Sequence, residues 1–206
     1  EVQLAADETL DDGLATLRKA LDGHRRPARA CNVLMRAAEL HPDHEGLLDS
    51  YEQVARDSGD DQMLMHYLDH RARHSTATTD HAREAVNKAR EIGDVARAEK
   101  LMERAVEIGT NGDTGLFALD WALLGLAEAA KDRGEVEAAV RWLEQAADVA
   151  EAEPLFALCR DVAGLAGKGD PTVAARLYEK LRERDPTARE AWEPLVEIYA
   201  SLGDID

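Results

Sequence analysis

The sequence predicts an all-helical fold, a right-handed α-solenoid of antiparallel helix pairs, with about five and a half repeats in one domain over residues 1–206. The first observation behind this prediction is a recurring turn signal, a glycine followed by an acidic residue. The second is a set of small and aliphatic residues at fixed distances from these glycines, on one face of a helix. The turn glycines are Gly59, Gly93, Gly134, Gly169 and Gly203, at intervals of 34, 41, 35 and 34 residues.

Each turn signal is expected to end one helix and begin the next. Glycine suits the left-handed conformation that ends a helix, and the acidic residue after it can cap the following helix. Pro171 follows Asp170 and suits the first position of a helix. A second kind of turn, between units, is marked by Pro42, Pro154 and Pro186. Each unit is therefore predicted to be a helix, a tight turn, a second helix and a short turn.

The units are expected at residues 11–44, 45–78, 79–119, 120–154 and 155–188, followed by half a unit at 189–206. The first unit is irregular, because Arg25 stands where the turn glycine is expected, between Gly23 and Pro27. We expect the chain to be a segment of a longer array, because Leu195 and Tyr199 in the last half unit are too apolar for a solvated end. The alternative is that this lone helix covers the last open face of the stack.

Four apolar columns fix the predicted helix faces. Alanine dominates the column five residues after the glycine, which indicates a close helix crossing. The columns are Leu48, Ala82, Leu123, Leu158 and Trp192 eleven residues before the glycine; Ala55, Ala89, Ala130, Leu165 and Tyr199 four before it; Leu64, Ala98, Ala139 and Ala174 five after it; and Leu68, Met102, Leu143 and Tyr178 nine after it. Three residues depart from the pattern: Asp161 falls in an apolar column, Arg71 replaces a small residue, and Pro194 should kink the final helix or delay its start.

The 34-residue period with two helices per unit resembles the tetratricopeptide family, most clearly in "AWEPLVEIYASLGD" with Trp192, Leu195 and Tyr199. The resemblance covers nearly the whole chain. It implies a binding scaffold without catalytic activity, in which the first helix of each pair lines a concave groove that holds a partner segment.

The long interval between Gly93 and Gly134 predicts a first helix extended by two turns, from Asp113 or Thr114 to about Asp132. Its apolar face would be Leu116, Leu119, Leu123, Leu126 and Ala130. A second apolar line contains Phe117, Trp121 and Leu124. We weigh two interpretations of this line: packing against the preceding unit, or an exposed anchor patch for a partner.

Composition excludes several classes of partner. The chain carries 42 acidic and 25 basic side chains and a net charge of −17, which should repel nucleic acid and anionic membranes. No apolar run approaches the roughly 20 residues that span a bilayer. Cys31 and Cys159 lack the spacing of a metal or redox site, so we expect free thiols in a reducing compartment, the cytoplasm.

The histidines of "HYLDHRARH" are the most prominent polar cluster. His66, His70 and His74 are four residues apart on one helix, a spacing that can bind zinc. No general base accompanies them in an HExxH motif, so we expect a solvated face and no specific metal site. We also find no phosphate-binding loop and no activated nucleophile, and we expect neither a cofactor nor an enzymatic activity.

The groove surface should display the residues ten, six and three positions before each turn glycine. Arg83 with Asn87 resembles the start of a carboxylate clamp, although Gly125 and Glu128 stand where the clamp needs polar donors. The partner is therefore expected to be a protein or peptide that is acidic or carboxylate-ended. The alternative is a structural or self-associating array with an unused groove, joined through its C-terminal face. The candidate groove residues are Lys19, Gln53, Arg56, Arg83, Asn87, Arg90, Trp121 and Phe156.

Overall fold

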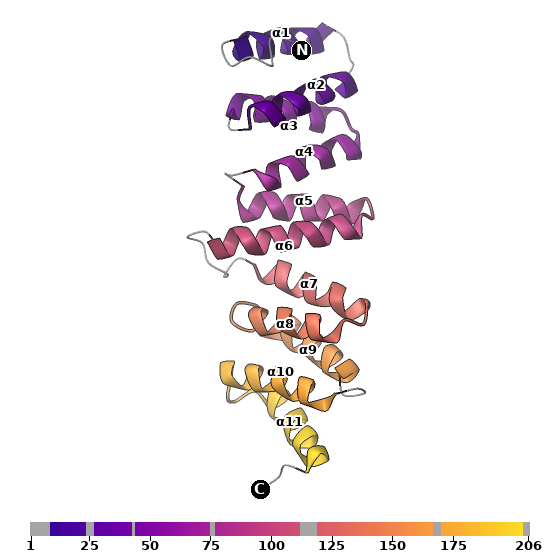
Figure 1. Ribbon diagram of the computed structural model, residues 1–206, viewed down its shortest axis with the longest axis vertical. Coiled ribbons are helices and arrows are strands. Elements are labelled where there is room, and N and C mark those ends of the chain that lie inside the picture. Colours follow the sequence, from indigo (N-terminus) through magenta and orange to yellow (C-terminus); the bar gives the residue numbers. More distant parts are fainter. Residues whose placement is uncertain are drawn as a thin grey trace. The chain divides into compact units, whose positions relative to one another are not determined.

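The computed structural model describes residues 9–23, 27–42, 44–74, 77–111, 119–166 and 170–203. This part of the chain contains eleven α-helices and no strand, which confirms the all-helical class (Figure 1). The helices are α1 (Leu10–Gly23), α2 (Pro27–Leu40), α3 (Glu45–Asp57), α4 (Asp61–Arg73), α5 (Thr79–Glu91), α6 (Val95–Asn111), α7 (Asp120–Asp132), α8 (Val136–Ala146), α9 (Ala152–Ala166), α10 (Pro171–Arg184) and α11 (Arg189–Leu202).

The chain forms two compact units, Glu1–Leu101 and Met102–Asp206. In the first unit, α2 packs on α3, α3 on α4 and α4 on α5, while α2 also contacts α4. Its core is aliphatic with two buried tyrosines, Tyr51 and Tyr67, whose rings meet edge to face with centroids 5.3 Å apart. Sequential packing of this kind buries one face of each helix on its neighbours.

The second unit follows the same rule. Helix α7 packs on α8, α8 on α9, α9 on α10 and α10 on α11, with further contacts from α7 to α9 and from α8 to α10. Leucines fill its centre: Leu123, Leu143, Leu155, Leu177 and Leu181 are fully buried. Helix α6 begins in the first unit and ends in the second.

The predicted turn chemistry is confirmed where the turns are described. Gly59, Gly93, Gly134 and Gly203 have φ of +65°, +76°, +75° and +78°. This left-handed conformation costs other residues about 1–2 kcal/mol. The Asp60 side chain caps α4 by accepting from two backbone N–H groups, and the Asp170 side chain caps α10 by accepting from the backbone N–H of Thr172. Glu135 makes no side-chain cap bond, and Gly169 lies outside the described residues.

The apolar columns hold in most helices, but Trp192 in α11 is exposed, and the register in α9 is wrong by one residue. There Cys159, Val162 and Ala166 are buried, while Asp161 and Leu165 are exposed. A shift of one residue from the predicted register keeps the Asp161 carboxylate in water, which avoids the large cost of burying an unpaired charge. The register counted from Gly169 placed that carboxylate in the core.

The prediction for the long interval is also wrong. Helix α7 begins at Asp120, and part of the extra length extends α6 to Asn111, for 17 residues. The extension continues the buried face of α6 through Ala105 and Gly109. Asp113, Thr114, Leu116 and Phe117 lie outside the described residues. Helix α11 starts at Arg189 and runs through Pro194, so its start is not delayed.

Candidate partner-binding surface

The groove residues predicted from the sequence divide between the two units. Those of the first unit are exposed and lie on the first helix of each pair: Lys19 on α1, Gln53 and Arg56 on α3, and Arg83, Asn87 and Arg90 on α5. We call the exposed faces of α1, α3 and α5 the first-helix surface. Trp121 on α7 and Phe156 on α9 belong to the second unit and are half-buried.

Arg56 forms an ion-pair bridge between α3 and α5. Its guanidinium donates to Glu84 at 2.6 Å and to Glu52, one turn earlier on its own helix, at 2.8 Å. These bonds raise the pKa of Arg56, the bond to Glu84 most of all. The positive charge of Arg56 is therefore compensated within the protein, and the bridge links α3 to α5.

Glu52 connects this bridge to the second helix of its pair. The Tyr67 hydroxyl on α4 donates to Glu52 at 2.9 Å. Burial alone would raise the pKa of Glu52, but the hydrogen bonds from Arg56 and Tyr67 lower it. Burial and the bond to Glu52 raise the pKa of Tyr67, so its hydroxyl stays a donor. Glu52 and Arg56 together thus link α3 to α4 and to α5.

A cavity of 350 Å³ opens beside this network, among α3, α4 and α5. Four of its nine lining residues are acidic, which could not be predicted from the sequence alone. The lining residues are Glu45, Leu48, Asp49, Glu52, Tyr67, Leu68, Arg71, His81 and Glu84. Arg71, noted in the sequence as a departure from the pattern, is the only arginine or lysine in this lining. His81 accepts a hydrogen bond from the Thr78 backbone N–H at 3.1 Å and closes the cap of α5.

The exposed face of α5 carries two arginines and an asparagine, in contrast to the acidic residues of the cavity. Arg83, Asn87 and Arg90 follow one another at intervals of four and three residues, which places them on one face of the helix. All three are exposed. Two guanidinium groups with an amide between them can bind carboxylate oxygens by paired hydrogen bonds.

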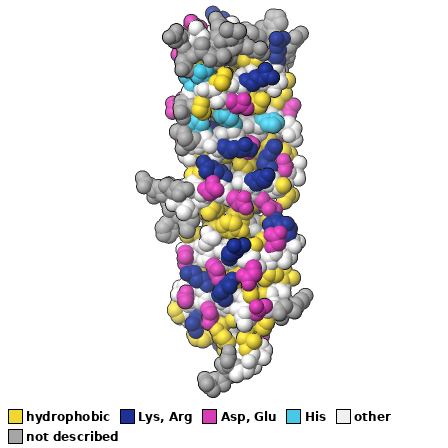
Figure 2. Space-filling model, in the orientation of Figure 1, with side chains coloured by type: hydrophobic (Ala, Val, Ile, Leu, Met, Phe, Trp, Pro, Cys, Tyr) yellow, Lys and Arg dark blue, Asp and Glu magenta, His cyan; other side chains and the backbone are white. Residues whose placement is uncertain are grey.

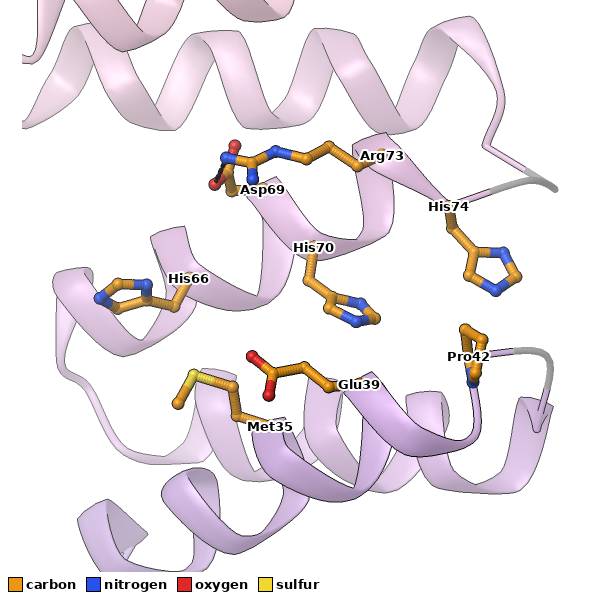
Figure 3. A pocket seen from close by; sticks show the side chains of 8 residues that line it. All are labelled: Met35, Glu39, Pro42, His66, Asp69, His70, Arg73 and His74. Carbon is orange, nitrogen blue, oxygen red and sulfur yellow. Dashed lines mark hydrogen bonds and ion pairs between the residues drawn. The ribbon is translucent and has the colours of Figure 1, made fainter.

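A second cavity, of 510 Å³, lies between α2 and α4, and we call it the histidine cleft. Figure 3 shows His66, His70 and His74 projecting from α4 on the side that faces α2. His66 is exposed as expected, but His70 is half-buried and His74 is buried, so the prediction of a solvated row is wrong for these two. The periodicity of α4 alone could not show that α2 covers these two side chains. In the described part of the chain, no three His, Cys, Asp or Glu side chains are placed to hold a metal ion.

Both cysteines are free, as expected because they lack the spacing of a metal or redox site, and both are buried. Burial raises the pKa of Cys159 to about 12 and also raises the pKa of Cys31. Both thiols are therefore poor nucleophiles. Within the described residues, every helix is too short or too polar to cross a bilayer.

Comparison with known proteins shows similarity to solved structures. No family model matches the chain, and no curated protein does. One of the similar solved structures is the crystal structure of the nearly identical TPR-like repeats of a Podosopora anserina "putative kinesin light chain". The identity is 20%, the similarity covers 87% of this chain and 97% of that one, and the TM-score is 0.39. From its own helices and turns, this chain has an all-helical repeat architecture that resembles tetratricopeptide proteins.

Proposed function

We propose that the chain is a protein-interaction scaffold whose first-helix surface binds a segment of a partner protein. The observation that carries the proposal is the exposed row of Arg83, Asn87 and Arg90 on α5. Helix α5 packs against α4, and the Arg56–Glu84 ion pair also links it to α3. A row on a helix that is fixed in this way needs little reorganisation to bind, which favours affinity.

The partner segment is acidic or ends in a carboxylate. Arginine forks pair both oxygens of a carboxylate, and Asn87 can add a hydrogen bond from its amide. The acidic residues of the cavity restrict where that group lies, since Glu45 and Asp49 repel it. The carboxylate is therefore placed over α5, and a neutral or basic part of the segment lies over the cavity.

A peptide library tests this proposal directly. Peptides with free C-termini are selected on the wild-type protein and on an Arg83→Glu, Arg90→Glu variant. We expect acidic and carboxylate-ended peptides to be enriched on the wild type and lost on the variant. The Arg29→Glu, Arg36→Glu variant is the matched control, because both arginines are exposed but lie on α2, outside the first-helix surface. Equal enrichment of acidic peptides on all three proteins would contradict the proposal.

The chemistry of the described residues favours binding over catalysis. The two thiols are buried and protonated, and the histidine on the cavity wall is engaged in a helix cap. The net charge of −17 opposes nucleic acid and anionic membrane surfaces as partners. Buried free thiols are in keeping with a reducing compartment, and we place the protein in the cytoplasm.

A second candidate function is self-association through α11. Trp192, Val196 and Leu202 are 43%, 57% and 39% exposed, a concentration of large apolar side chains on one helix. Trp192 is held in place by a 2.7 Å hydrogen bond from its Nε1 to the Pro186 carbonyl. Sedimentation velocity over a range of concentrations tests this candidate. Val196→Lys should abolish any concentration-dependent association, while Ser201→Lys, an exposed polar position on the same helix, should not.

A further inference from the structure

The histidines of this chain are confined to its first unit. All seven lie between residues 24 and 81, and the sequence from residue 82 to residue 206 contains none. Figure 2 shows histidine side chains gathered on the part of the visible face that belongs to the N-terminal end. Histidine is the side chain whose charge ordinarily changes between pH 5 and 8. Mild acidification therefore adds charge mainly to the first unit.

His70 lies half-buried in the histidine cleft and also contacts α3. Its Nδ1 is buried and has no hydrogen-bond partner. Its ring meets the edge of Tyr51 on α3, with centroids 6.5 Å apart and an interplanar angle of 63°. A neutral imidazole needs only one donor N–H, but the charged ring has two, and the N–H on Nδ1 would lack an acceptor. The site therefore accommodates neutral His70 better than charged His70.

The charged groups around His70 do not offset this cost. Glu39 on α2 and Asp69 on α4 favour the charged ring, but Asp69 is already paired with Arg73. His74 and Arg73 on α4 oppose it, and Tyr51 on α3 stays uncharged. Burial, followed by His74, lowers the pKa of His70 below its ordinary value. The geometry and the charges thus act in the same direction.

We infer that the contact between α2 and α4 is proton-sensitive and loosens when His70 becomes charged. The unfolded or locally opened chain exposes His70 to water and binds its proton with an ordinary pKa. At pH values between that pKa and the lower pKa of the closed state, the open state binds more protons than the closed state. The contribution of neutral His70 to the stability of the α2–α4 contact is therefore complete above the ordinary pKa of histidine, and this contribution is lost as the pH falls through this window.

Amide hydrogen exchange at pH 7.5 and pH 5.5 tests this inference. Protection factors, which correct for the intrinsic pH dependence of exchange, should fall in α2 and α4, by up to about tenfold per pH unit for one proton. The second unit is an internal control, because it lacks histidine and contains all three tryptophans, Trp121, Trp142 and Trp192. Tryptophan fluorescence should be unchanged over the same range.

Three variants assign the effect to His70. His70→Gln cannot take up a proton, so the ratio of protection at the two pH values should approach one. His66→Gln, an exposed position one turn earlier on α4, should keep the wild-type ratio. Glu39→Gln removes a carboxylate that favours the charged ring, so it should enlarge the loss of protection at pH 5.5. Protection in the wild type that does not change with pH would overturn the inference, as would a wild-type ratio in His70→Gln. Because the readout is a ratio, it remains informative if His70→Gln lowers stability at both pH values.

Discussion

Replacing Ala139 by phenylalanine is expected to destabilise the second unit strongly. Ala139 lies on α8, is completely buried and belongs to the alanine column with Ala98 and Ala174. Helix α8 packs against both α7 and α9, so a ring at this position has no free space to enter. Close-packed interiors respond to added volume by forcing side chains off their rotamers and by moving the backbone.

The expected cost is on the order of 1–3 kcal/mol for such overpacking. For a unit of this size, each kcal/mol lowers the Tm by roughly 4–8 °C, so the transition should move by at least about 4 °C. Tryptophan fluorescence reports the correct unit, because Trp121 lies on α7 and Trp142 on α8. Thermal melts followed by this signal therefore measure the packing around Ala139 directly.

The matched control is Gln145→Phe, which adds the same ring at an exposed position of α8. Its Tm should stay close to that of the wild type, because an exposed substitution usually changes stability by no more than about 0.5 kcal/mol. If Ala139→Phe melts at the wild-type temperature, the alanine column does not mark a close crossing, and the packing argument fails.

Three further changes should destabilise the first unit, each measurable by chemical denaturation followed by circular dichroism. Gly93→Ala should cost about 1–2 kcal/mol from the backbone alone, because φ is +76° and an added Cβ would meet nothing within 4 Å. Asp60→Ala should cost about 0.5–2 kcal/mol through loss of the cap on α4; an unchanged midpoint would refute this. Tyr67→Phe should cost on the order of 1.5–3 kcal/mol, because it removes a hydrogen bond to a charged carboxylate; a neutral result would show that Glu52 is satisfied without it.

Local chemistry explains which features could be predicted from the sequence. The glycine turns were predictable because only glycine adopts the left-handed conformation without cost, and an acidic cap after it has a fixed position. The register of α9 was not, because it was counted from Gly169 rather than from the buried face itself. Asp161 was the available warning: a carboxylate in an apolar column indicates that the column is misplaced.

The chemistry of the candidate surface depends on contacts between helices. The sequence pattern placed Arg56 on an exposed face, but it could not show that Glu84, 28 residues away, binds its guanidinium. It likewise could not show that α2 covers His70. Helical periodicity predicts which face a residue occupies, whereas its partners depend on how neighbouring helices are spaced and rotated.

The affinity of an acidic peptide for wild-type and Arg83→Glu proteins tests the central claim most directly. The peptide is one selected on the wild type, and its binding is measured by fluorescence anisotropy at low and high salt, alongside the Tm of each protein. We predict at least about tenfold weaker binding to the variant at unchanged Tm, and weaker wild-type binding at high salt, because exposed charges are screened. Equal affinity for a folded Arg83→Glu protein would contradict the account and leave self-association through α11 as the better explanation.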